Sequence, residues 1–201
     1  MTGSMKTQMP AARTIHILET IRERRSIRNF QDAHIPEEAV DALIEALRWA
    51  PSAGNLQSRK FFFVFNDDKK KKLAAAAGNP DFVARMKKLV KNALNLNFVS
   101  KAPLVVVACL DRRISTRYGE RGVNLYSIQD VAASVMNMML TAHELGLGSV
   151  WVGAFDENTV GEVMGLPDNL RPVALIPIGY PSAVPAPTPR MLGEEAVEFV
   201  R

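Results

Sequence analysis

The chain has 201 residues, 47% of them hydrophobic and 23% charged, and its formal net charge is +4. This length and composition are typical of one globular domain. No apolar run is long enough to cross a bilayer, and the first residues lack the unbroken apolar stretch of a secretory signal, so no membrane association is expected. Residues 1–12 are expected to be a disordered or tag-like N-terminus.

The cysteine, histidine and lysine residues exclude several kinds of site. The single cysteine, Cys109, rules out an internal disulfide, and its place in an apolar run favours a buried, inert thiol. The three histidines are too scattered for a metal site. These features fit a reducing cytoplasm. The basic run 69–72 is interpreted as a solvated face, and no nucleic-acid motif accompanies it, so nucleic-acid binding is not expected.

The first half of the chain predicts four helices and one strand. The second helix has the clearest signals, because Pro36 suits its first position, apolar residues recur at helical spacing and Pro51 ends it. The aromatic run KFFFVFN is too apolar for a solvated element and predicts a buried strand. The predicted elements are helices over 14–24, 36–50, 69–77 and 81–97, a loop over 26–33 and a strand over 60–66.

The second half of the chain contains the longest predicted helix, 125–145. Its apolar residues cover more than one face, which indicates a place at the centre of a core or in a subunit interface. The polar, Arg-rich segment 111–124 predicts an exposed loop or lid. Prolines recur after residue 180 and predict an extended tail. The remaining predicted elements are strands over 103–110, 149–155 and 173–179 and a helix over 157–164.

The order of these elements predicts the fold class. Helices and strands are mixed without strict alternation, which favours an α+β sheet flanked by helices over a doubly wound parallel sheet. No internal repeat or linker divides the chain. We therefore expect one domain over 13–180, followed by an extended arm over 181–201.

The first of three candidate binding segments is a basic turn. Arg24, Arg25, Ser26 and Arg28 place three guanidinium groups and a hydroxyl close together in the sequence. Arginine makes forked, charge-assisted hydrogen bonds that match phosphate oxygens. The segment is consistent with a phosphate site, and a solvated basic turn has the same pattern.

The other two candidate segments combine small and polar residues. In Pro51–Gln57, small residues would let a ligand approach the backbone, and the polar side chains suit a polyol or the edge of a heterocycle. In the segment 145–155, Gly153 and Ala154 would let a flat ring lie against the backbone. An ordinary helix-stop turn and a plain helix-to-strand turn with a packed Trp151 are the alternatives.

Taken together and in this order, the segments resemble the FMN-dependent nitroreductase family. The resemblance extends from Glu23 to about Arg190 and is carried by the strings RRSIRNF, APSAGNLQ, QDVAASVMNMMLTAHELGLGSVWVGAF and RPVALIPIGYP. It implies an α+β fold with a mainly antiparallel sheet, an intertwined homodimer and two FMN sites at the interface. The arm 181–201 would then pack on the partner subunit.

The resemblance also implies roles for particular residues. Those matching the positions that hold the FMN phosphate and part of the ring are Arg24, Arg25, Ser26, Arg28 and, from the C-terminal arm, Arg190. Those matching the loop that reaches the flavin from the partner subunit are Pro51, Ser52, Ala53 and Asn55, with Gln57 just beyond. Those matching the segment beside the reactive part of the ring are Trp151, Val152, Gly153 and Ala154.

The chain departs from the family pattern at several of these places. Ala53 stands where a second serine is common, and Ser58 and Arg59 stand where many members have Pro-Trp. Thr188 stands where some members have lysine. The cation that faces the pyrimidine edge of the flavin is therefore not identified by the resemblance.

The implied activity is an FMN-dependent oxidoreduction. NADH or NADPH would donate electrons in a ping-pong scheme, and a nitroaromatic, a quinone or a similar small molecule would accept them. No residue is expected to serve as an obligate proton donor, because the flavin carries the chemistry.

Other functions of the same fold remain open from the sequence. They are reductive dehalogenation, oxygen-dependent flavin breakdown and flavin binding without turnover. The arginines of 111–124 could meet an anionic substrate, or they could form a surface salt-bridge network with Glu120.

Overall fold

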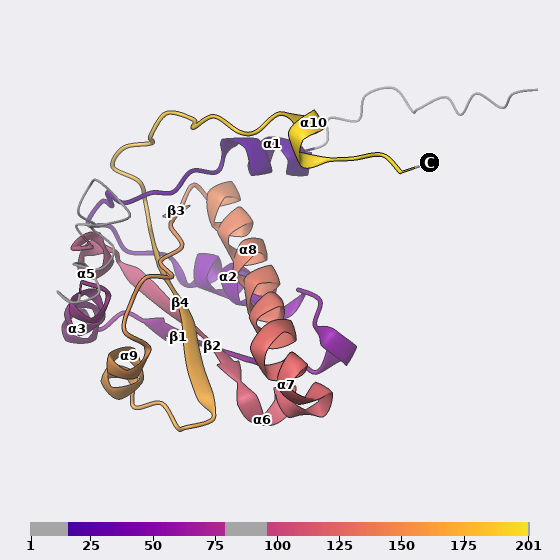
Figure 1. The fold of residues 1–201 in the computed structure, drawn as a ribbon. Helices are drawn as coiled ribbons and strands as arrows, with labels where there is room; N and C mark the ends of the chain where they lie inside the picture. Colours follow the sequence, from indigo (N-terminus) through magenta and orange to yellow (C-terminus); the bar gives the residue numbers. More distant parts are fainter. Residues whose placement is uncertain (1–15, 79–95, 201) are drawn as a thin grey trace, which may run out of the picture.

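The computed structural model of the chain has a four-stranded antiparallel sheet at its centre (Figure 1). The structure describes residues 16–78 and 96–200. The strand order is β1-β2-β4-β3, formed by β1 (Arg59–Val64), β2 (Leu104–Asp111), β4 (Leu170–Gly179) and β3 (Gly148–Ser149). The predicted α+β class is confirmed. The predicted N-terminal segment 1–12 and nearly all of the predicted helix 81–97 lie outside the described residues.

Helices cover both faces of the sheet. The described helices longer than one turn are α1 (His16–Glu23), α2 (Glu37–Arg48), α3 (Asp67–Ala77), α8 (Ser127–Glu144) and α9 (Glu157–Met164). The single-turn helix α5 (Phe98–Lys101) lies between α3 and β2, and the single-turn helix α10 (Gly193–Ala196) lies near the end of the arm. In Figure 1, α8 crosses the front of the sheet, whereas α3, α5 and α9 lie together at its other side.

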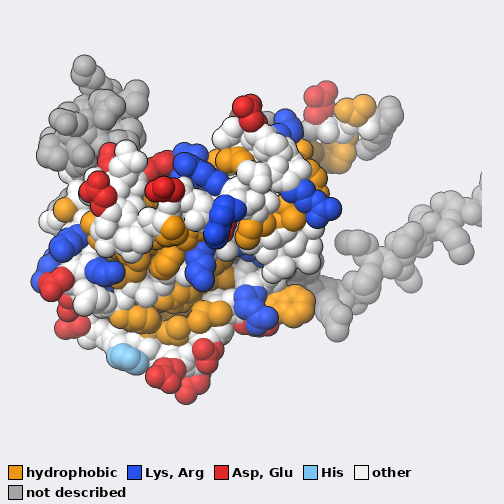
Figure 2. All heavy atoms as spheres, turned by 90° about the horizontal axis from the view of Figure 1, so that it is seen from below, with side chains coloured by type: hydrophobic (Ala, Val, Ile, Leu, Met, Phe, Trp, Pro, Cys, Tyr) orange, Lys and Arg blue, Asp and Glu red, His pale blue; other side chains and the backbone are white. Residues whose placement is uncertain are grey.

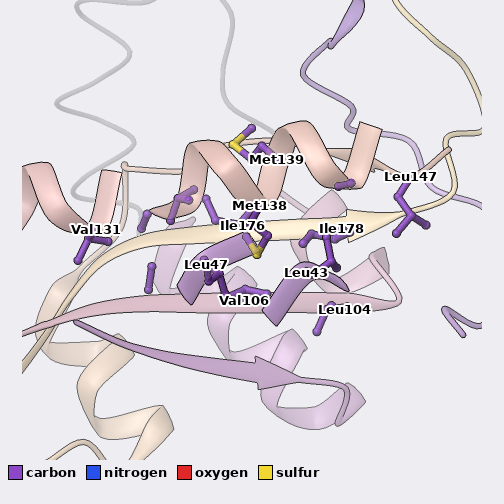
Figure 3. Packing of buried hydrophobic residues seen from close by; sticks show 14 of the residues in the cluster. Leu43, Leu47, Leu104, Val106, Val131, Met138, Met139, Leu147, Ile176 and Ile178 are labelled. Carbon is purple, nitrogen blue, oxygen red and sulfur yellow. The ribbon is translucent and has the colours of Figure 1, made fainter. Parts of the chain in front are cut away.

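Strand β2 separates two hydrophobic cores because neighbouring residues of a strand point to opposite faces. Leu104, Val106 and Ala108 pack with α2 and α8 (Figure 3). Val105, Val107 and Cys109 pack with α3, α5 and α9. Every residue of β2 is buried. Burial raises the pKa of the Cys109 thiol to about 12, which confirms the expected inert thiol.

Three predicted elements are corrected by the structure. Pro36 is the N-cap of α2 and not its first helical residue, because its extended ψ of 149° precedes the first turn. The strand predicted over 60–66 is the partly exposed edge β1, where only Val64 is buried, since it has a neighbour on one side alone. The strand predicted over 149–155 shortens to Gly148–Ser149 and an isolated bridge between Val152 and Leu175.

The predicted loop 111–124 is also wrong, because this segment is helical. It contains α6 (Arg112–Ser115), a 3-10 turn (Thr116–Tyr118), α7 (Gly119–Arg121) and a π-helical turn (Gly122–Tyr126) that leads into α8. The Asp111 carboxylate accepts a hydrogen bond from the Arg113 backbone N–H at 3.0 Å and caps the first turn. Polar composition indicated exposure here, and exposed turns can still be helical.

The C-terminal arm begins against the loop that follows α1. The Gln31 amide donates to the carbonyl of Pro181 at 2.8 Å, and the Ser182 N–H donates to the carbonyl of Asn29 at 3.0 Å. From residue 182 to residue 200 every side chain of the arm is exposed. Several of these exposed side chains are apolar: Val184, Met191, Leu192, Val197, Phe199 and Val200.

Candidate functional site

The basic turn after α1 lies directly against strand β3. The Ile27 N–H donates to the carbonyl of Ser149 at 3.0 Å, and Ser26 forms a parallel bridge with Ser149. This approach requires glycine at position 148, because a Cβ there would overlap the Ile27 side chain. The fold thus joins the first and third predicted segments, which are more than 100 residues apart in the sequence.

A cavity of about 220 Å³ opens beside this junction. Its walls come from the basic turn, the last two turns of α8, strand β3 and the start of the arm. We call it the cradle and define it by Arg24, Arg25, Met139, His143 and Ser149.

The cradle contains buried polar atoms with no partner. Within the described residues, Nη1 of Arg24 and Oγ of Ser149 are buried and make no hydrogen bond. Buried polar atoms are nearly always paired, so two such atoms at one cavity indicate a missing ligand. The Arg25 guanidinium, by contrast, donates to the carbonyl of Arg24 at 2.9 Å.

The electrostatics of the cradle favour an anion. Burial lowers the pKa of the Arg24 guanidinium, and the positive charges of Arg190 and Arg25 lower it further. Arg190 comes from the exposed arm, so a third cation lies close enough to act on this site. A phosphate would relieve the repulsion and supply acceptors for the unpaired donors. The residues present therefore fit the phosphate of FMN.

Arg28 lies at the edge of this arrangement. Its side chain is exposed, and its guanidinium makes one long hydrogen bond of 3.4 Å to the carbonyl of Ser26. It does not line the cradle. The structure therefore supports a phosphate-binding role for Arg28 less than it supports that role for Arg24 and Arg25.

The segment after β3 presents free backbone donors. Val152 is buried and exchanges hydrogen bonds with Leu175, each of 2.9 Å. In the described residues, the N–H groups of Gly153 and Ala154 donate no hydrogen bond. Trp151 is 39% exposed, so its indole does not belong to the core. The segment can therefore offer two N–H groups and an exposed aromatic face to a ligand.

The loop after α2, residues 51–57, has a strained but well-held backbone. Gly54, Asn55 and Gln57 have φ values of 54°, 54° and 52°, in the left-handed region. Ser52 holds the loop from within, because its Oγ accepts from the Gln57 N–H at 3.1 Å and its carbonyl accepts from the Asn55 N–H at 3.0 Å. The Ala53 N–H donates to Oδ1 of Asp130 on α8 at 3.0 Å.

Arg59 fastens this loop to its surroundings. Its guanidinium donates to the carbonyls of Ala50 at 2.8 Å and Pro51 at 3.0 Å, and more weakly to those of Arg48 and Asp130. Burial lowers the pKa of Arg59, and the Asp130 carboxylate opposes that effect. One side chain thus ends α2, holds the start of the loop and ties both to α8.

The loop and the cradle lie at opposite ends of α8. The loop meets the helix at Asp130, and the cradle meets it at Met139 and His143. At 1.5 Å per residue, the contacts at Asp130 and His143 are roughly 20 Å apart along the axis. No residue of the loop lines the cradle. One chain therefore brings the first and third predicted segments together and keeps the second apart.

Four residues of this arrangement were not singled out by sequence reasoning, although Gly148 and Ser149 lie within the candidate segment 145–155. Ser149 and Gly148 complete the cradle, and Asp130 and Arg59 hold the loop. A carboxylate within a largely apolar helix is a signal that could have identified Asp130. Arg59 carries no such local signal.

Among residues 16–78 and 96–200, no group of three or more His, Cys, Asp or Glu residues is arranged to hold a metal ion. None of the helices described there is long and apolar enough to span a membrane.

Sequence comparisons place this chain among redox enzymes. The profile of the nitroreductase family matches residues 21–180. A Methanothermobacter thermautotrophicus protein with the provisional name NADH dehydrogenase/NAD(P)H nitroreductase is 31% identical over 177 residues, which cover 84% of this chain and 79% of that protein. The Bacillus subtilis FMN reductase (NADPH) is 27% identical over 180 residues, covering 87% and 69%.

The fold comparison agrees. The structure of the Vibrio harveyi NADPH:FMN oxidoreductase in complex with NAD⁺ superposes with a TM-score of 0.78 at 26% identity, covering 92% of this chain and 77% of that chain. The family profile includes the basic turn, the loop and the β3 segment. The chain therefore belongs to the nitroreductase family of oxidoreductases.

Proposed function

We infer that the chain is an FMN-dependent oxidoreductase that takes electrons from NADH or NADPH and passes them to a small acceptor such as a nitroaromatic or a quinone. The observation that carries this inference is the cradle, where Arg24 and Ser149 leave polar atoms buried and unpaired among three arginines. Relatives named as FMN and NAD(P)H reductases support both cofactors.

When bound, FMN supplies the two-electron redox chemistry. The residues of the chain hold it and shape its surroundings. Arg24, Arg25 and Arg190 neutralise the phosphate. The free N–H groups of Gly153 and Ala154 stabilise negative charge at the edge of a flat ring, and the exposed Trp151 lies next to them.

The proposed active unit is a homodimer with shared sites. Loop 51–57 stands at the far end of α8 from the cradle, so a second chain is the simplest source of a loop for each cradle. The exposed arm supports the same assembly, because its apolar side chains have no cover in one chain.

An apolar groove offers a place for the partner's arm. Ile44, Leu47, Phe61 and Phe63 line a cavity of about 340 Å³ beside the unpaired edge of β1. Figure 2 shows hydrophobic side chains gathered in a band on one face of the molecule, with Lys and Arg at its borders. An exposed strand edge with apolar neighbours is a natural surface for another chain.

The cofactor and the electron donor can be tested with one preparation. We expect the purified protein, reconstituted with FMN, to be yellow and to lose its flavin absorbance when NADH or NADPH is added without oxygen. Acid release and chromatography should identify FMN. FAD, or no flavin uptake, would contradict the proposal. FMN that neither nucleotide reduces would indicate a binding module without turnover.

We further propose ping-pong kinetics, in which donor and acceptor use the same face of the flavin in turn. Parallel double-reciprocal lines at several acceptor concentrations would support it. Intersecting lines would show that both substrates bind together.

A mixed dimer tests the shared site. One subunit carries Arg24→Gln and the other carries Asn55→Ala. If each site takes Arg24 from one chain and Asn55 from the other, one site receives both changes and the other receives neither. Half of the sites should then bind FMN normally, while both mutant homodimers bind poorly. Uniformly weak binding in the mixed dimer would place both residues in the same chain.

A further inference from the structure

The arginine-rich helical segment 112–126 lies against loop 51–57. The Tyr118 hydroxyl sits over Gly54 so closely that a Cβ at position 54 would overlap it. Tyr126, at the end of the segment, lines a cavity of about 320 Å³ together with Pro51, Ser52 and Ala53. The segment therefore borders the loop that we propose to face the flavin.

The two tyrosines form a fixed aromatic wall. Their rings pack edge to face with centroids 5.7 Å apart. Arg121 holds this wall, since its Nε donates to the Tyr126 hydroxyl at 2.9 Å and its guanidinium carbon lies 5.4 Å from the centre of the Tyr126 ring. Within the described residues, its two terminal nitrogens donate no hydrogen bond.

The charge of the segment is positive and only partly neutralised. Residues 111–126 contain four arginines and two carboxylates, Asp111 and Glu120. Asp111 pairs with Arg113 at 3.1 Å. Neither Glu120 nor Arg117 forms an ion pair within the described chain. The surface salt-bridge network with Glu120 that the sequence allowed is therefore not formed.

The cavity itself has a negative end. Asp130 lines it, and Oδ2 of Asp130 is buried with no partner in the described part of the chain. Arg121 does not line this cavity but borders it through its contact with Tyr126. A carboxylate placed near Asp130 would be repelled, whereas one placed near Arg121 would be attracted. A bound acceptor would thus keep its anionic group toward Arg121 and its ring along the tyrosines.

We propose that the acceptor of this enzyme is a planar aromatic compound with a carboxylate, bound by Arg121 against the wall of Tyr118 and Tyr126. This assignment rests on the proposed function, because it takes loop 51–57 to face the flavin. Arg121 supplies the specificity through a charge-assisted pair, and the tyrosines supply an apolar surface of matching shape.

A matched pair of acceptors tests the substrate class. We use 4-nitrobenzoate and its neutral methyl ester, with the FMN-loaded enzyme and NADPH or NADH. In the first step each nitro group takes two electrons and two protons to give a nitroso group and water. The hydride of the nucleotide accounts for both electrons and one proton, and the solvent supplies the second proton. We expect kcat/KM for the anion to exceed that for the ester by roughly tenfold, mainly through a lower KM.

Variants identify the residue responsible. Arg121→Gln should lower kcat/KM for the anion by roughly tenfold and change that for the ester by less than about twofold. Arg121→Lys keeps the charge and should restore part of the loss. Lys101→Gln removes one positive charge from α5, on the other side of the sheet, and should leave the ratio unchanged.

Binding of non-reducible analogues gives a second readout. Calorimetric titration of the oxidised holoenzyme with benzoate and benzamide should show benzoate binding that weakens with added salt and with Arg121→Gln. Equal handling of anion and ester, unchanged by Arg121→Gln, would overturn the proposed substrate class while the oxidoreductase function stands. Failure of NADH and NADPH to reduce the bound flavin would instead overturn the proposed function and this inference with it.

Discussion

The cradle leaves buried polar groups unpaired, whereas loop 51–57 pairs its polar groups within the chain. In the cradle, Arg24 and Ser149 keep buried atoms without partners, and like charges face one another. In the loop, which contains three left-handed residues, Ser52 and Asp130 accept hydrogen bonds from backbone N–H groups, and Arg59 donates to a backbone carbonyl. One region leaves polar groups unpaired, and the other is fixed before any ligand arrives.

The difference separates binding from positioning. The cradle has unpaired donors and arginines that repel one another, so an anion that enters it lowers the free energy. The cradle is therefore suited to binding. A strained loop held by internal bonds loses no further freedom when it meets a ligand, so it is built to place its groups. Substitutions in the two regions should therefore have opposite effects on the protein without flavin.

Arg24→Gln should have the largest effect on flavin binding. Losing a charged phosphate ligand should raise the dissociation constant of FMN by roughly 100-fold, or about 3 kcal/mol. The free energy of unfolding of the apoprotein should not fall, because the substitution removes a buried charge that Arg190 and Arg25 repel. Flavin fluorescence titration and urea unfolding measure the two quantities. A destabilised apoprotein with normal flavin affinity would reverse the assignment.

Arg59→Ala should have the largest effect on the apoprotein. The change removes the donor for carbonyls of Ala50 and Pro51 and should lower the free energy of unfolding by about 2 kcal/mol. Arg48→Ala is the matched control on α2, since its exposed pair with Glu45 contributes little. Urea unfolding at one protein concentration compares them. Equal losses in both variants would show that Arg59 does not fasten the loop.

Ser149→Ala should make the apoprotein more stable but weaken its affinity for FMN. Removing an unpaired buried hydroxyl should raise the free energy of unfolding of the apoprotein by about 1 kcal/mol, and it should weaken FMN binding by about fivefold. Both are measured as for Arg24→Gln. A less stable apoprotein would mean that the hydroxyl already has a partner in solution.

Arg28→Ala should have the smallest effect on FMN affinity, and it tests whether Arg28 belongs to the phosphate site. Because this side chain is exposed, water and salt weaken any contact with the phosphate, and FMN affinity should fall by only about threefold. Titration in low and high salt checks this, with the larger loss expected in low salt. A loss as large as that of Arg24→Gln would move Arg28 into the phosphate site.

Local sequence patterns predicted much of the fold because burial repeats with the period of each element. The helix expected over 157–164 is observed as Glu157–Met164, and the apolar run after Pro103 is the central strand β2. A polar sequence pattern indicates that a segment is exposed but not which secondary structure it forms. The segment 111–124 is polar in sequence and helical in space.

By itself, the sequence determined the family, the α+β class and the basic turn, since each is carried by residues close together in the chain. Tertiary structure alone decided that Ser149 joins Arg24 and that Arg59 holds the loop. It also decided that Lys70, from a run expected to be solvated, is buried and donates to the carbonyl of Ala102 at 2.8 Å. Arg24 and Ser149 are far apart in the chain, as are Lys70 and Ala102, and Arg59 also reaches Asp130 on α8. Only the packing of helices on the sheet sets these distances.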